Sequence, residues 1–213
     1  MHAAADRCQR IGACRKTGQG VMCPSYMATR EEEHATRGRA NALVHALSQP
    51  DPARALGDER LHEILDLCLE CKACKSECPL SVDMASMKSE FLSHYNEIHG
   101  TPLRSRVFAS IRTLNRLGST FAPLSNLPAP TGLLGITNQR PRPRFVRQNL
   151  IRWNKKRPRT DGKPVIFLAD SFTTFTEPGI GRASIELLTA AGYDVRLEHA
   201  GCCGRASIYK GLL

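Results

Sequence analysis

Apolar residues in the first 118 positions recur every three or four residues, which is the spacing of helices. Thr29 followed by Glu32 predicts a helix start by a capping box, and Thr101 followed by Pro102 predicts another. Apolar positions such as Phe91 are interpreted as core. The four helices predicted in this way lie at residues 29–47, 58–68, 82–99 and 101–118. This part of the chain is therefore expected to be helical.

The last fifty residues have a different pattern. KPVIFLAD at 163–170 is typical of a buried strand, residues 179–192 of a helix, and residues 193–198 of a second strand. A strand, helix and strand of these lengths predict a right-handed parallel βαβ unit. One such unit has too few strands to close a sheet, so we expect part of a larger domain. The fold class is thus mainly α with a partial α/β region.

Residues 119–163 separate the two patterns and are rich in proline, glycine and basic residues. The predicted domains are accordingly 1–118, the linker 119–163, and 164–213. Residues 138–163 hold ten Lys or Arg and one Asp, which is +9 of the formal net charge of +10. We interpret this stretch as a solvated linker or a strap on an acidic partner domain. With Phe145 and Trp153 it could also contact nucleic acid, but no nucleic-acid motif accompanies it, so we expect no such partner.

No apolar run approaches the roughly 20 residues of a membrane span, and the start of the chain has no signal-peptide pattern. We therefore expect a cytoplasmic protein, or one that is peripheral to the inner membrane through its partners. The chain has nine cysteines, an odd number, and seven of them have metal-type spacing. This usage favours thiolate ligands in a reducing compartment over disulfides.

The segment from Cys68 to Pro79 reads CLECKACKSECP, which is a C-x2-C-x2-C-x3-C-P run. This spacing is typical of the loops by which bacterial ferredoxins bind a cubane iron–sulfur cluster. The first three cysteines point at one cluster. Pro79 turns the chain away, so Cys78 is expected to reach a second cluster, and a partner run must lie elsewhere in the sequence.

The partner run is Cys8, Cys14 and Cys23, the last of which precedes Pro24. Cys8 and Cys14 have the separation of Cys68 and Cys74, and Ile11 takes the place of the middle cysteine. Aligning the two Cys-Pro ends predicts a crosswise arrangement. The 4Fe-4S cluster then has the ligands Cys23, Cys68, Cys71 and Cys74, and the second site has Cys8, Cys14 and Cys78.

Cys202 and Cys203 follow the second predicted strand, where open α/β sheets place their sites. They are candidates for a catalytic or cluster-binding thiol pair, or for a pair without a role. Paired Cys-x2-Cys motifs also bind structural zinc, but the third cysteine and the Cys-Pro end disfavour zinc here. We find no Ser-His-Asp order, phosphate-binding glycine loop or carboxylate pair, so no catalytic residue is predicted.

Three segments, at residues 22–40, 67–91 and 199–213, resemble the iron–sulfur portion of large bacterial FAD-linked oxidases of the D-2-hydroxyglutarate dehydrogenase type. The arrangement is also similar to the iron–sulfur subunits of glycolate oxidase, anaerobic glycerol-3-phosphate dehydrogenase and heterodisulfide reductase. The resemblance implies a helical two-cluster ferredoxin domain followed by a cysteine-rich CCG domain. The sequence has one CCG signature, where these relatives often have two.

In the resembled oxidases a flavin domain oxidises the hydroxy acid and the iron–sulfur part takes the electrons. The sequence has no flavin-binding half, so FAD is expected on a missing domain or on a partner, and the electron acceptor is unknown. The resemblance thus implies the electron-transfer part of an oxidoreductase. A thiol/disulfide redox subunit of the heterodisulfide reductase kind is the alternative.

The apolar residue at Ile11 is similar to one in the iron–sulfur subunit of succinate dehydrogenase, where the cluster is 3Fe-4S. The Cys8 and Cys14 site is therefore expected to hold 3Fe-4S, or 4Fe-4S with a ligand other than cysteine, or to be empty.

Overall fold

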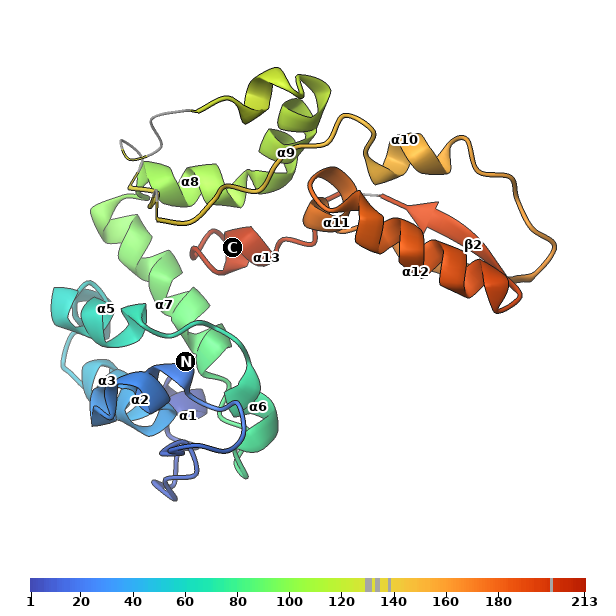
Figure 1. The fold of residues 1–213 in the computed structure, drawn as a ribbon. Coiled ribbons are helices and arrows are strands. Elements are labelled where there is room, and N and C mark those ends of the chain that lie inside the picture. The colour runs from blue at the N-terminus through green and yellow to red at the C-terminus, as the bar shows by residue number, and fades with distance from the viewer. Residues whose placement is uncertain (129–131, 133–134, 138, 200) are drawn as a thin grey trace. The chain divides into compact units, whose positions relative to one another are not determined.

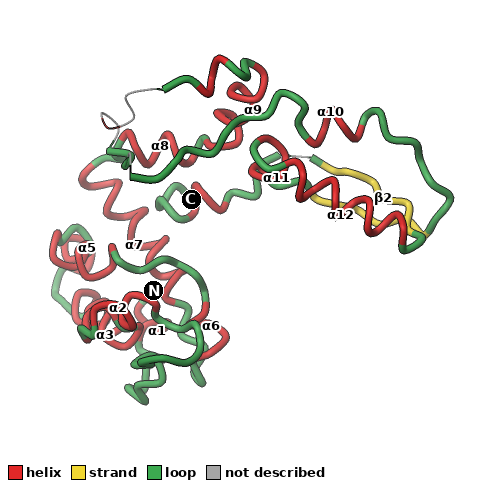
Figure 2. The backbone as a smooth tube through the Cα atoms, viewed as in Figure 1, coloured by secondary structure: helices red, strands yellow, loops and turns green. Residues whose placement is uncertain are grey.

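The computed structural model describes residues 1–128, 132, 135–137, 139–199 and 201–213, and these form two units (Figures 1 and 2). The first unit contains Met1–Ala109 and Ala206–Leu213, and the second contains Ser110–Arg205. Both units are mainly helical, and the second also holds a two-stranded parallel sheet. The prediction of a mainly α fold with a small α/β part is confirmed.

The first unit is built from short helices around one longer helix. In chain order it contains α1 (His2–Ala5), α2 (Pro24–Thr29), the 3-10 helix η1 (Glu32–His34), α3 (Thr36–Leu47), α4 (Pro52–Ala55), α5 (Glu59–Asp66), α6 (Ala73–Glu77), α7 (Met84–His99) and α8 (Leu103–Ala109), and most of α13 (Arg205–Ile208). Its core is formed by apolar side chains of α3, α5 and α7 that include Leu43, Leu65 and Phe91, all fully buried. Figure 2 shows loops joining α1 to α2 and α5 to α6. These loops carry the cysteine-rich segments.

The predicted helix at 29–47 is wrong in its first part. The helix α2 ends at Thr29 because Arg30 adopts a left-handed φ of 63°, and the chain then forms η1 before α3 begins at Thr36. Thr29 does not cap α3: its hydroxyl donates to the carbonyl of Ser25 and contacts the His34 ring. Side chain to backbone bonding of this kind competes with helix formation. The break turns the segment after Cys23 back on itself.

Two other helices begin at side-chain caps, within or beside their predicted ranges. Asp58 accepts a hydrogen bond from the Leu61 amide at 2.8 Å and starts α5, and Asp83 accepts one from the Ser86 amide at 3.1 Å and starts α7. These caps satisfy amides that have no partner inside the helix. The helix α7 ends at Gly100, as predicted. Both helices therefore have defined starts on either side of the second cysteine segment.

The second unit contains α9 (Ile111–Thr120), the 3-10 helix η2 (Leu124–Asn126), α10 (Leu150–Asn154), β1 (Lys163–Leu168), α11 (Ser171–Phe175), α12 (Pro178–Ala190) and β2 (Tyr193–Glu198). The two strands pair in parallel over six positions, from Lys163 opposite Tyr193 to Leu168 opposite Glu198. The helix α12 packs on the sheet, with Ile185 and Val195 in the core (Figure 1). The parallel βαβ prediction is confirmed, although α11 was not predicted.

The strand β1 is not buried on both faces, which corrects the prediction of a buried strand. Ile166 is 68% exposed and Leu168 is 69% exposed, whereas Val165 and Phe167 contact the core. The helix α12 covers the face of the sheet that carries Val165 and Phe167 and leaves the opposite face exposed. Parallel strands usually have helices on both faces, so the apolar run alone suggested two-sided burial.

The predicted helix at 101–118 is also corrected. It is interrupted at Ser110, where α8 gives way to α9, and it ends at Thr120. Two of its apolar side chains, Leu114 and Leu117, are exposed. Ser119 is buried instead, because its hydroxyl donates to the carbonyl of Val146 at 2.7 Å and accepts from the Asn149 amide group at 3.0 Å. Polar contacts with residues 145–149 thus select the buried face of α9.

The predicted linker at 119–163 contributes to the second unit. Leu150, at the start of α10, is fully buried in the core of this unit. The Asn149 side chain caps α10 by accepting from the Arg152 amide at 3.0 Å. In the part of the chain that the structure describes, no helix has the length and apolar character needed to cross a bilayer.

Candidate metal centres

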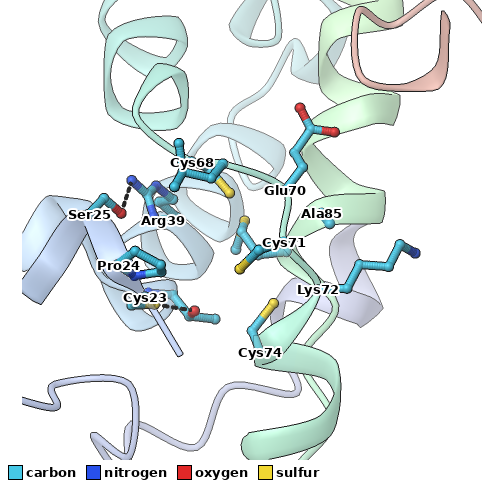
Figure 3. Close-up of a pocket in the computed structure, with 13 residues that line it drawn as sticks. Cys23, Pro24, Ser25, Arg39, Cys68, Glu70, Cys71, Lys72, Cys74 and Ala85 are labelled. Carbon is cyan, nitrogen blue, oxygen red and sulfur yellow. Dashed lines mark hydrogen bonds between the residues drawn. The ribbon is translucent and has the colours of Figure 1, made fainter. Parts of the chain in front are cut away.

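Four cysteines from two distant segments line one hollow in the first unit (Figure 3). Cys23 lies at the start of α2, Cys68 and Cys71 lie in the loop after α5, and Cys74 lies in α6. We call this the first site. The structure brings together the four cysteines expected to share the 4Fe-4S cluster. Their role as ligands stays a prediction.

Three further cysteines line a separate hollow. They are Cys8, Cys14 and Cys78, and we call their hollow the second site. Cys78 thus lines a different hollow from Cys71 and Cys74, which are close to it in sequence. The backbone leaves α6 in an extended conformation at Cys78, just before Pro79. One hollow has four thiols and the other has three.

Ile11 lines the second site at the position of the missing cysteine and is 61% exposed. The residues that line this hollow, all of them in the described part of the chain, include no Asp, Glu or His. Among its lining residues the site therefore offers three thiols and no carboxylate or imidazole. A fourth ligand there would have to be a solvent species or a weaker protein donor such as Thr36.

Left-handed backbone conformations cluster at both cysteine segments. Six described residues other than glycine have positive φ, and five of them are a predicted ligand or lie within three residues of one. These five are Arg10, Cys23, Glu70, Lys72 and Ser81. Such conformations cost free energy, and they persist where the surrounding structure enforces them, often at functional sites. The loops curl so that thiols far apart in sequence face one space.

Cys14 and Cys23 connect the two sites. A hydrogen bond between their side chains lowers the pKa of Cys14 to about 6 and raises the pKa of Cys23. Cys23 also accepts a hydrogen bond from the Thr36 amide at 3.0 Å, and its sulfur lies 2.8 Å from the Thr36 hydroxyl. Cys14 accepts from the Arg37 amide at 3.4 Å. The first turn of α3 therefore directs two backbone amides at sulfur, a contact that stabilises thiolate and cluster sulfur.

A buried ion pair supports the loop of the first site. The ammonium group of Lys88 donates to the carbonyls of Asp66 and Cys68, both at 2.9 Å, and lies 3.8 Å from the Glu70 carboxylate. Glu70 also accepts from the Ser89 hydroxyl at 3.1 Å. Burial raises the pKa of Glu70 and lowers the pKa of Lys88. Figure 3 shows the Glu70 carboxylate directed away from the cysteines.

Arg39 is a further charged residue that lines the first site, and it is 2% exposed. Burial lowers its pKa, whereas the nearby thiols act in the opposite direction. No sequence motif singles out Arg39, Lys88 or Thr36 as part of a site. Arg39 lies four positions before Leu43 on the apolar stripe of α3, a spacing that indicates burial but not a role at the site.

Cys202 and Cys203 belong to the second unit and lie in the loop between β2 and α13. Both thiols are exposed. They follow the carboxyl end of β2, as predicted. The other seven cysteines all belong to the first unit. Among its described residues the second unit therefore holds no third cysteine beside this pair.

Comparison with known proteins identifies the class of the first unit. Residues 4–82 match the family model of the 4Fe-4S dicluster domain. This segment contains all seven cysteines of the two sites. The match supports the predicted two-cluster ferredoxin-type domain and iron–sulfur clusters as its cofactors, and it does not assign individual ligands or cluster types.

The chain is also similar to larger oxidoreductases. It is 29% identical to D-2-hydroxyglutarate dehydrogenase of Pseudomonas putida in an alignment of 140 positions, which covers 51% of the chain and 14% of the relative. The Escherichia coli protein of the same name is 22% identical over 98% of the chain and 26% of the relative. A Bacillus subtilis protein named probable glycolate oxidase iron-sulfur subunit is 31% identical over 43% of the chain and 19% of the relative.

The chain thus spans at most 26% of the length of these relatives. The chain is therefore similar to a part of these oxidoreductases, and one of the relatives is named an iron-sulfur subunit. No solved structure matches the chain significantly.

Proposed function

We propose that the chain carries electrons between a flavin dehydrogenase and an acceptor through two iron–sulfur clusters. The observation that carries this proposal is the crosswise grouping of cysteines. Cys23 shares a hollow with Cys68, Cys71 and Cys74, and Cys78 shares one with Cys8 and Cys14. Such an exchange of the last cysteine between two runs is the ligand pattern of two-cluster ferredoxins.

The residues of the chain have separate tasks in this function. The seven thiolates would hold the clusters, which supply one-electron redox chemistry when bound. Thr36 lines both sites and contacts Cys23, so it fixes the wall between them. Lys88 holds two carbonyls of the loop around Cys68. Burial of Cys14, Cys23 and Cys74 limits access of water and oxygen.

The second site is proposed to hold a 3Fe-4S cluster. Three thiols line it, Ile11 replaces the fourth, and the lining includes no acidic residue or histidine. The lack of a fourth protein ligand favours loss of one iron from a cubane cluster. The first site, with four thiols, is proposed to hold a 4Fe-4S cluster.

The electron donor is proposed to be reduced FAD in a dehydrogenase domain or subunit that oxidises a 2-hydroxy acid of the D-2-hydroxyglutarate or glycolate type. This part of the proposal rests on the names of the relatives and on the resemblance of the sequence. A flavin gives up two electrons, and a pair of one-electron carriers can receive them singly.

Metal analysis of the chain after anaerobic purification tests the proposal. We expect a brown protein with about seven irons per chain, four at one site and three at the other, and an electron paramagnetic resonance signal of an oxidised three-iron cluster. A colourless protein with stoichiometric zinc would contradict the function. Eight irons without a three-iron signal would contradict only the proposed cluster type of the second site.

A further inference from the structure

The helix α3 places a guanidinium group in the interior of the first unit. Thr36, Arg39, Ala40 and Leu43 share the buried face of this helix. Arg39 is the largest of the fully buried side chains described in the chain. It reaches the hollow of the first site, where Figure 3 shows it beside Ser25.

The hydrogen-bond partners of Arg39 are neutral. Its Nε donates to the carbonyl of Ile64 at 3.0 Å, and its Nη2 donates to the hydroxyl of Ser25 at 3.0 Å. None of the ion pairs found among the described residues includes Arg39. The one carboxylate that lines the same hollow is Glu70, which is paired with Lys88 and directed away.

A buried charge without a counter-charge is strongly unfavourable, and proteins rarely retain one. The groups around Arg39 that could supply negative charge are the thiolates of the first site. We propose that Arg39 is the built-in counter-ion of the 4Fe-4S cluster at the first site and raises the reduction potential of that cluster. This inference rests on the proposed function, because it requires a cluster at that site.

The direction of the effect follows from charge. A 4Fe-4S core with four thiolates is an anion, and reduction adds one electron from a reduced flavin or a chemical reductant without forming or breaking a bond. The added negative charge interacts favourably with a nearby cation, most strongly where water is excluded. Arg39 therefore stabilises the reduced state more than the oxidised state. Removal of the charge of Arg39 therefore lowers the reduction potential of the first cluster.

Lys72 and Lys88 beside the first site, and Arg37 beside the second, are each paired with a carboxylate. Lys88 is paired with Glu70. At the second site, Arg37 is paired with Glu32 at 2.6 Å. Arg39 lines the first site and not the second, so we expect its replacement to affect the first cluster more than the second.

The test is a redox titration of the full chain after anaerobic purification, monitored by electron paramagnetic resonance. Arg39→Gln removes the charge and keeps a hydrogen-bond donor, and Arg39→Lys keeps the charge. The matched control is Arg60→Gln, which removes an arginine from α5 whose side chain is 59% exposed and paired with Glu33 and Glu63. Iron content is measured for each variant.

We expect Arg39→Gln to lower the reduction potential of the first cluster and to change that of the second cluster little. In Arg39→Lys and Arg60→Gln, the reduction potential of the first cluster should stay close to the wild-type value. Loss of the first cluster in Arg39→Gln with retention in Arg39→Lys also supports a counter-ion. A wild-type potential in Arg39→Gln overturns the inference, as does an equal shift or equal cluster loss in both Arg39 variants. An iron-free wild-type chain would instead contradict the proposed function and, with it, the basis of this inference.

Discussion

Ile11 is the residue at which the two cysteine runs differ most in chemistry. It lies at the position of the middle cysteine and lines the second site with Cys8, Cys14 and Cys78. Its exposure at the rim means that a smaller side chain there would not leave a cavity in the core. Its effect on the protein should therefore be on cluster type and not on folding.

Replacing Ile11 with cysteine should supply the missing fourth thiolate. We expect Ile11→Cys to raise the iron content from about seven to about eight per chain and to remove the three-iron resonance of the oxidised protein. Ile11→Ser is the control of similar size with a poor ligand, and it should behave as wild type. A three-iron signal that persists in Ile11→Cys would show that this position does not face the cluster.

The Cys14 and Cys23 pair predicts a pH dependence of the metal-free chain. The folded pKa of Cys14 is lowered to about 6, so its contribution to stability is present above the ordinary thiol pKa and is lost as the pH falls through about 6. Cys23 has a raised pKa, so its contribution is present below the ordinary value and is lost as the pH rises above it.

Thiolate absorbance as a function of pH measures this coupling. We expect one thiolate to form near pH 6, and this step should disappear in Cys23→Ala, which lacks the hydrogen-bond partner. Cys203→Ala, which removes an exposed thiol of the second unit, is the control and should keep the step. An unchanged step in Cys23→Ala would refute the coupling.

At the scale of elements, the start of α7 joins helix capping to the first site. Asp83 accepts from the Ser86 amide at 3.1 Å and lies 3.3 Å from the ammonium group of Lys72, in the loop that carries Cys71. Loss of a cap typically costs about 1 kcal/mol, and asparagine is nearly as good a cap as aspartate. One side chain thus positions both a helix and a ligand loop.

Asp83→Ala should lower the free energy of unfolding by about 1 kcal/mol, and Asp83→Asn should lower it by less, because the amide oxygen still caps α7. Chemical denaturation of the metal-free chain measures both. Asp51→Ala, at the exposed four-residue helix α4, is the control with a smaller expected effect. Equal losses in Asp83→Ala and Asp83→Asn would assign the stability to charge and not to the cap.

Helices and strands could be predicted from the sequence where the apolar pattern and the turn residues on either side of it agree. The strands at 163–168 and 193–198 and the helix α12 match their predicted ranges closely, because turn residues bound each apolar run. The break between α2 and α3 was not predictable, because the Thr29 and Glu32 pattern is the same in a true cap and in a turn. The exposed face of β1 was not predictable either, since an apolar run does not reveal what covers it.

The candidate sites were likewise predictable only in the part that the spacing of the cysteines determines. Cysteine spacing alone grouped Cys23 with Cys68, Cys71 and Cys74, because the geometry of a cluster restricts which thiols can share it. Arg39 could not be assigned from the sequence, because its role depends on contacts with α2 and α5 that are made only in the folded unit.

At the scale of the whole molecule, each unit has its own core. Phe91 is fully buried in the first and Leu150 in the second. Units with separate cores can unfold separately, and a ligand stabilises only the unit that binds it. We therefore expect two thermal transitions, of which only one rises in temperature when the clusters are bound.

Core substitutions assign the transitions. Phe91→Ala should destabilise the first unit by about 3–5 kcal/mol, and Leu150→Ala should destabilise the second by about 2–5 kcal/mol. Each variant should lower the temperature of one thermal transition in calorimetry under reducing conditions and leave the temperature of the other unchanged. A single transition that moves in both variants would contradict independent units.

The crosswise sharing of cysteines is tested most directly by a crystal structure of the anaerobically purified chain with the iron atoms located by anomalous scattering. The account predicts one iron cluster bound by Cys23, Cys68, Cys71 and Cys74, and a second bound by Cys8, Cys14 and Cys78. An iron cluster bound by Cys68, Cys71, Cys74 and Cys78 together, with Cys23 outside it, would contradict the account.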